Sequence, residues 1–148
     1  MRIAVLAPVW FPVPPTGYGG IEWVVWLLAG GLVEAGHDVT LFAAGRSHTK
    51  ARLEYVYEQA PSEQIGQTFY ELRHALHCYA RQDDFDLIND HSGLVAAMAG
   101  GALHTTFVHT AHGPLNGVHG QLYAQLAALR TPFRSRRPFF ARGTEPCS

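Results

Sequence analysis

Short apolar segments alternate with longer amphipathic ones along most of the chain. Continuous apolar runs are typical of strands buried on both faces of a parallel sheet, whereas apolar residues at three- and four-residue spacing indicate helices. The runs predict strands at residues 2–7, 38–43, 53–57, 85–90 and 105–109. The spaced pattern predicts helices at residues 21–35, 62–81, 94–102 and 118–129. Strands that alternate with helices predict an α/β fold: a Rossmann-like open parallel sheet with helices on both faces, spanning residues 1–130.

The chain beyond residue 130 follows neither pattern, and its charge is reversed. Residues 1–129 hold six Lys and Arg against eleven Asp and Glu, whereas residues 130–148 hold five Arg and one Glu. The loss of periodicity coincides with this change of charge. We therefore predict an irregular, arginine-rich tail at residues 131–148, either disordered or left by truncation or frameshift of the gene.

Composition places the chain among ordinary globular domains. Its 148 residues are 47% hydrophobic and 16% charged, which suits one domain with a buried core. The two cysteines are too few for a disulfide scaffold, and Cys78 is expected to be a small buried hydrophobe. The sequence offers no membrane span or signal peptide, so we expect a cytoplasmic protein. The acidic body has no recognition element for nucleic acid, and no nucleic-acid partner is expected.

A glycine-rich turn follows the first predicted strand. In open α/β sheets, ligands bind beyond the carboxyl ends of the strands, where this turn, Gly17–Glu22, precedes a helix. Glycine allows backbone amides to approach an anion closely, and the start of a helix adds partial positive charge. The spacing matches neither a dinucleotide-binding fingerprint nor a P-loop. An anion-binding turn and a merely flexible turn both remain open.

Histidines follow the fourth and fifth predicted strands. Asp90 and His91 end one strand and His112 lies just after the other, so all three can reach the same sheet edge. These side chains could hydrogen-bond sugar hydroxyls. Alternatively, Asp90 or Ser92 simply caps the next helix.

Two histidines on one predicted helix are candidate metal ligands. His74 and His77 share one face of a predicted helix and could hold a metal ion, but an amphipathic helix face with incidental histidines is far more common. A zinc site needs further ligands, and the sequence supplies no coherent set. No metal and no bound cofactor are expected.

Three segments together carry a resemblance to a known family. They are the Gly19–Glu22 turn that opens a long helix, the stretch Gly36–Phe42, and the later His112-Gly113 pair. In this order they resemble the N-terminal domain of family-4 glycosyltransferases, which are retaining enzymes of the GT-B architecture. The resemblance covers about residues 1–130 and implies transfer of a sugar from a nucleotide-sugar donor, the co-substrate, to a sugar or lipid-linked acceptor.

The resemblance also assigns roles to individual residues. In such enzymes the glycine turn approaches the donor diphosphate, the late histidine lies near the reacting sugar, and the turn after the fourth strand lines the cleft. By resemblance, the catalytic residue is His112. The residues that contact the donor diphosphate are Gly19 and Gly20. The predicted substrate-binding residues are Tyr18, Glu22, Asp90, His91 and Gly113.

The family's donor-binding domain, with its paired glutamates, has no counterpart in this sequence. One hypothesis is therefore an acceptor-side half that is inactive alone and needs a donor domain, such as one on a separate chain. The alternative is a non-catalytic remnant or a small-ligand or nucleotide-binding Rossmann-like module.

Overall fold

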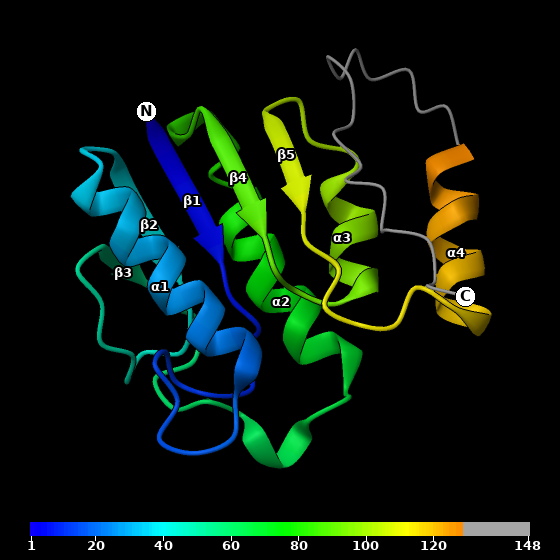
Figure 1. Ribbon diagram of the computed structural model, residues 1–148, viewed down its shortest axis with the longest axis horizontal. Coiled ribbons are helices and arrows are strands. Elements are labelled where there is room, and N and C mark those ends of the chain that lie inside the picture. The colour runs from blue at the N-terminus through cyan, green and yellow to red at the C-terminus, as the bar shows by residue number, and fades with distance from the viewer. Residues whose placement is uncertain (129–148) are drawn as a thin grey trace, which may run out of the picture.

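Five parallel strands form one sheet in the computed structural model, which describes residues 1–128. The strand order is β3-β2-β1-β4-β5, with β1 at the centre (Figure 1). The strands are β1 (Arg2–Leu6), β2 (Asp38–Phe42), β3 (Arg52–Glu54), β4 (Leu87–Asp90) and β5 (Thr106–His109). Every pairing is parallel. This confirms the predicted open parallel sheet.

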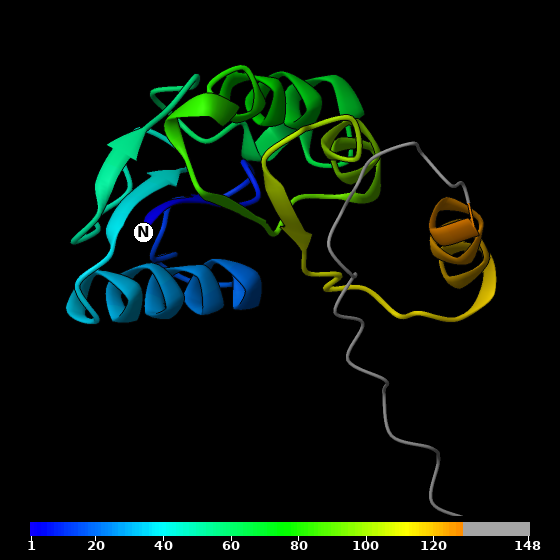
Figure 2. The same ribbon diagram turned by 90° about the horizontal axis from the view of Figure 1, so that it is seen from above.

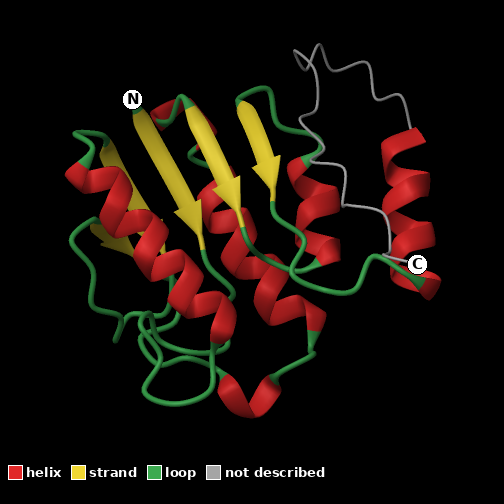
Figure 3. Ribbon diagram, viewed as in Figure 1, coloured by secondary structure: helices red, strands yellow, loops and turns green. Residues whose placement is uncertain are grey.

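Helices cover both faces of this sheet, as expected. They are α1 (Gly20–Glu34), α2 (Thr68–Tyr79), α3 (Leu94–Gly100) and α4 (Gly117–Ala128), with short 3₁₀ turns at Ser62–Gln64 and Gln82–Asp84. Helix α1 lies on one face, whereas α2 and α3 lie together on the other (Figure 2; Figure 3). Helix α4 lies to the side of the sheet beyond β5 (Figure 1).

The central strand supplies both halves of the core, because successive side chains point to opposite faces. Val5 belongs to the cluster built around α1, where it is grouped with Val25. Leu6 belongs to the opposite cluster, with Ala75 and Cys78 of α2. Val5, Leu6 and Cys78 are all fully buried, so the prediction that Cys78 is a core residue is confirmed.

The single helix predicted over residues 62–81 is wrong, because the segment is divided in two. A 3₁₀ turn at Ser62–Gln64 is followed by Gly66 with a positive φ of 89°, and α2 begins only at Thr68. A residue with that φ cannot continue a right-handed helix, and glycine adopts it without strain. The predicted strand at 85–90 also starts later, at Leu87, because a 3₁₀ turn at Gln82–Asp84, with Phe85 as its C-cap, directly precedes it.

The predicted tail at residues 131–148 lies outside the described residues. None of the helices described between residues 1 and 128 has the length and hydropathy needed to cross a bilayer.

His74 is a fully buried polar side chain within the apolar interior under α2. Neither ring nitrogen has a hydrogen-bond partner among the described residues. Burial disfavours the charged imidazolium and lowers the pKa of His74 from 6.5 to about 4. As the pH falls, His74 therefore becomes protonated near pH 6.5 in the unfolded chain but only near pH 4 in the folded chain.

Replacing His74 with leucine should make the protein less sensitive to acid. As pH falls from 7 to 5, His74 costs the folded state about 2 kcal/mol, because only the unfolded form is protonated there. His74→Leu should remove that part of the loss and leave stability at pH 7 equal or higher. Urea unfolding at both pH values tests this, with the exposed His119→Leu as the control. An unchanged pH dependence in His74→Leu would contradict it.

Candidate functional site

Three loops with the predicted site residues leave the same edge of the sheet. Strands β1, β4 and β5 all point their carboxyl ends to this edge (Figure 1). Tyr18–Glu22 follows β1, Asp90 and His91 close β4, and His112 follows β5. The parallel topology therefore gathers segments that are up to 94 residues apart in the sequence.

Asp90 is a fully buried carboxylate at the end of β4, and its partners fix it firmly. Its Oδ1 accepts the backbone N–H of Ser92 at 3.0 Å, and its Oδ2 lies 2.6 Å from His109 Nδ1. The strand register places Asp90 directly opposite His109. The far nitrogen of that ring, Nε2, lies 3.0 Å from the hydroxyl of Tyr123 in α4. A carboxylate, an imidazole and a phenol thus form one polar chain from the interior to α4.

His91 and His112 form a second pair next to this chain. His91 Nδ1 lies 2.7 Å from His112 Nε2, and the rings are stacked with centroids 5.0 Å apart. One nitrogen must donate and the other accept, so one proton is shared between the rings. His91 is buried, whereas His112 is exposed and forms the outer member of the pair.

Both rings of this pair favour the neutral form. Burial and the proximity of His112 lower the pKa of His91 from 6.5 to about 4. Burial, followed by the proximity of His109, also lowers the pKa of His112. The pair is therefore a hydrogen-bonding unit without net charge at neutral pH, suited to hydroxyl groups rather than to anions.

The turn after β4 keeps polar atoms without partners. Within residues 1–128, the buried His91 Nε2 and Ser92 Oγ have no hydrogen-bond partner. Buried polar atoms of this kind are rare in folded proteins. These two atoms could therefore form hydrogen bonds with a ligand beside the Asp90–His109 and His91–His112 pairs.

The expectation that Asp90 or Ser92 caps the next helix is wrong. The N-cap of α3 is Gly93, and no side chain of the turn caps the helix. Instead, Glu71 of α2 reaches across and accepts the Gly93 N–H at 2.8 Å. Burial raises the pKa of Glu71. The two oxygens of Asp90 contact the Ser92 N–H and His109 instead of the first amides of α3.

The glycine turn before α1 is shaped by close backbone contacts. Gly19 is buried with φ 154°, and a Cβ there would lie 2.7 Å from Pro15 and 2.9 Å from Glu22 Oε2. Gly20, in contrast, is exposed, and a Cβ there would meet nothing within 4 Å. No side chain caps the start of α1. Glu22 is buried, which raises the pKa of its carboxyl, and Tyr18 projects outward with 89% of its surface exposed.

The structure brings some predicted site residues together and leaves others apart. Asp90, His91 and His112 lie in the two adjacent pairs described above. Among residues 1–128, no hydrogen bond or ion pair joins the Gly19–Glu22 turn to the histidines. Gly113 is exposed, and a Cβ there would meet nothing within 4 Å.

His74 and His77 do not form the start of a metal site in the described structure. His74 is fully buried, whereas His77 is partly exposed and packs against the ring of Phe42. No group of three or more His, Cys, Asp or Glu side chains in residues 1–128 has the arrangement of a metal site.

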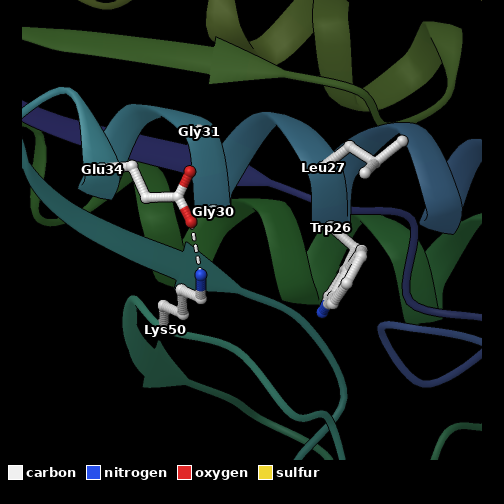
Figure 4. A pocket seen from close by; sticks show the side chains of 6 residues that line it. All are labelled: Trp26, Leu27, Gly30, Gly31, Glu34 and Lys50. Atoms are coloured by element: carbon white, nitrogen blue, oxygen red, sulfur yellow. Dashed lines mark hydrogen bonds and ion pairs between the residues drawn. The ribbon is translucent and has the colours of Figure 1, made fainter.

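Two shallow hollows lie outside the histidine pairs. One, of about 200 Å³, is bounded by α1 and by Lys50, whose amine pairs with Glu34 (Figure 4). Its lining is Trp26, Leu27, Gly30, Gly31, Glu34 and Lys50. The other, of about 280 Å³, is lined by Tyr57, Phe69, Tyr70 and Arg73. Neither contains a residue that the sequence singled out for chemistry.

Comparison with known proteins agrees with this architecture. Residues 18–144 match Glycosyltransferase Family 4. The chain belongs to glycosyltransferase family 4. The family match runs past residue 130, where we expected the resemblance to end. Among curated proteins, no sequence matches significantly.

One similar solved structure is AviGT4, a glycosyltransferase involved in avilamycin A biosynthesis. It is 32% identical to this chain, with a TM-score of 0.53. The match covers 78% of this family-4 chain but only 34% of the AviGT4 chain. The sheet described here is thus the Rossmann-like fold of a GT-B N-terminal domain.

Sequence reasoning missed three residues of this site. His109 was not predicted to pair with Asp90, although aligning the last residues of the two strands would have placed them side by side. Glu71 gave no signal, because an acidic residue on a helix is ordinarily solvated. Tyr123 also gave none, since its contact with His109 depends on where α4 lies in space.

The proximity of His112 should be measurable through the pKa of His91. His112→Gln removes an imidazole whose charge opposes protonation of His91, so the pKa of His91 should rise from about 4 toward 6.5. Long-range ¹H–¹⁵N spectra across a pH series report both rings. The exposed His119→Gln is the control and should leave His91 unchanged. Because burial is the larger cause of the low pKa, the pairing is contradicted if His112→Gln leaves the pKa of His91 unchanged.

Proposed function

We propose that this chain is the acceptor-side half of a retaining glycosyltransferase that uses a nucleotide sugar. One observation carries the proposal: Asp90, His91 and His112 gather in two adjacent hydrogen-bonded pairs at the sheet edge that also bears the glycine turn. Membership of family 4 gives that arrangement its chemical meaning.

His112 is the residue proposed to face the reacting sugar. It is the exposed member of the histidine pair, so its ring is accessible from the sheet edge. The lowered pKa values of both rings keep the pair uncharged, which favours hydrogen bonding to a sugar hydroxyl. Asp90 was predicted to bind substrate, but it is fully buried with both oxygens engaged, so Asp90 and His91 act behind His112 as positioning groups.

The glycine turn is proposed to receive the donor diphosphate. Gly20 is open to solvent at the uncapped start of α1, where backbone amides carry partial positive charge. As the nucleoside diphosphate leaves, negative charge develops on it, and amides already in place stabilise that charge. Burial raises the pKa of the Glu22 carboxyl, which lies in the first turn of the same helix.

Transfer requires more than this chain provides. It spans 34% of the AviGT4 chain, and a reaction between two substrates depends on holding both in one geometry. We therefore propose that the 148 residues alone bind substrates weakly and transfer no sugar until a donor domain completes the cleft.

Diphosphate binding at the turn can be tested by a matched pair of glycine substitutions. Millimolar UDP should shift the amide signals of Gly20 and Ile21 in ¹H–¹⁵N spectra of the full chain. Gly20→Ala should weaken this response about tenfold, because the methyl group keeps phosphate from the amide. Gly17→Ala should have no effect, since a Cβ at either position meets nothing within 4 Å and both variants should fold normally.

Two outcomes would contradict the proposal. One is an equal response to UDP in the wild type and in Gly20→Ala. The other is tight binding of NAD in a parallel calorimetric titration, which would indicate a dinucleotide-binding module instead.

A further inference from the structure

Three aromatic rings and one guanidinium meet on the surface where α2 begins. Tyr57 comes from the loop after β3, and Phe69, Tyr70 and Arg73 come from α2. On the helix, Arg73 follows Phe69 by four residues and Tyr70 by three, so these side chains share one face. Together the four residues, here called the aromatic shelf, line the hollow of about 280 Å³.

Two rings of the aromatic shelf, those of Tyr57 and Tyr70, hold each other in place. The centroids of Tyr57 and Tyr70 lie 5.7 Å apart with their planes tilted by 36°. The Tyr57 hydroxyl donates to the Tyr70 carbonyl at 3.4 Å, and Arg73 lies over the Tyr57 ring at 5.2 Å. A surface that is ordered in advance loses little side-chain entropy when a ligand binds.

The packing of the fold does not explain why a large aromatic residue, Phe69, stands on the surface. Its side chain is 84% exposed, although it is among the most hydrophobic in the chain. The face of α2 that packs on the sheet carries Ala75 and Cys78 instead. An exposed aromatic ring beside a hollow is a feature of binding surfaces.

Arg73 gives the aromatic shelf a positive charge that the described chain leaves without a carboxylate. Within residues 1–128, Arg2, Arg52 and Arg81 each form an ion pair, and Arg73 forms none. Its guanidinium can therefore form paired hydrogen bonds to an incoming carboxylate or phosphate.

The aromatic shelf adjoins the histidine site through α2 itself. Glu71, between Tyr70 and Arg73 in the sequence, reaches Gly93 beside Asp90. The loop after β3 and the start of α2 also lie at the carboxyl edge of the sheet (Figure 1). A ligand on the aromatic shelf therefore sits on the same side of the domain as His112.

We propose that the aromatic shelf binds a pyranose ring that bears an anionic group, and that this ring belongs to the acceptor. The flat C–H face of a pyranose packs against aromatic rings, while Arg73 pairs with its carboxylate or phosphate. The hollow of about 280 Å³ is open to solvent, so a sugar ring would rest against the aromatic shelf without being enclosed. The acceptor role rests on the proposed function, whereas the binding does not.

The test is a titration of the full 148-residue chain followed by ¹H–¹⁵N spectra. The probes are methyl glucuronide, glucose 6-phosphate and, as the neutral reference, methyl glucoside. Either anionic sugar should shift the signals of the aromatic shelf and bind about tenfold more tightly than methyl glucoside. The stronger of the two identifies whether the natural group is a carboxylate or a phosphate.

Two variants separate stacking from charge. Arg73→Gln should remove the preference for anionic sugars, and Phe69→Ala should weaken binding of all three probes. The matched controls are Arg2→Gln, which removes the same charge at the opposite sheet edge, and Leu76→Ala, which shortens another exposed apolar side chain on α2. Neither control should change binding.

Absence of shifts at the aromatic shelf with both anionic sugars would overturn the proposal, as would binding that Arg73→Gln leaves unchanged. Self-association that Phe69→Ala abolishes, without sugar binding, would assign the surface to a protein contact and overturn it too. None of these outcomes involves the glycine turn, so a failure here is distinct from a failure of UDP binding at Gly20.

Discussion

The parallel pairing of β1 with both β2 and β4 is the constraint on which the rest of the molecule depends. A strand with parallel neighbours on each side needs crossover connections, and those connections must cover its two faces. Ala4, Val5 and Leu6 are fully buried for this reason. The same pairing brings the ends of the strands to one edge, where every predicted site residue lies.

The alternation of strands with helices and the two covered faces follow from local pattern, which explains why the fold class was predictable; the strand order was not predicted. The apolar run at the first strand has no polar alternation, and only a strand covered on both faces tolerates that. The prediction of one helix at residues 62–81 was wrong because of a single glycine, Gly66. Apolar spacing continues through Gly66, so the pattern alone gives no sign that this glycine adopts a left-handed conformation.

The site was predictable only as far as its residues lie at strand ends. Asp90, His91 and His112 follow strands, so topology alone brings them close together. Their division into pairs does not follow from topology, because a 2.6 Å contact between Asp90 and His109 depends on register and rotamer. The aromatic shelf could not be predicted from the sequence. Tyr57 and Tyr70 belong to different elements and come into contact only when the loop between them folds.

The backbone N–H of Gly93, at the start of helix α3, already has a hydrogen-bond partner in another helix. Because the Glu71 carboxylate accepts the Gly93 N–H, negative charge from α2 offsets the partial positive charge where α3 starts. At α1 no side-chain cap does the same. The two helices thus begin differently at one sheet edge: the first amide of α3 is occupied by a carboxyl group from another helix, whereas α1 carries its own acidic residue, Glu22, in its first turn. Any ligand that binds at this edge therefore meets a carboxyl group near the start of both helices.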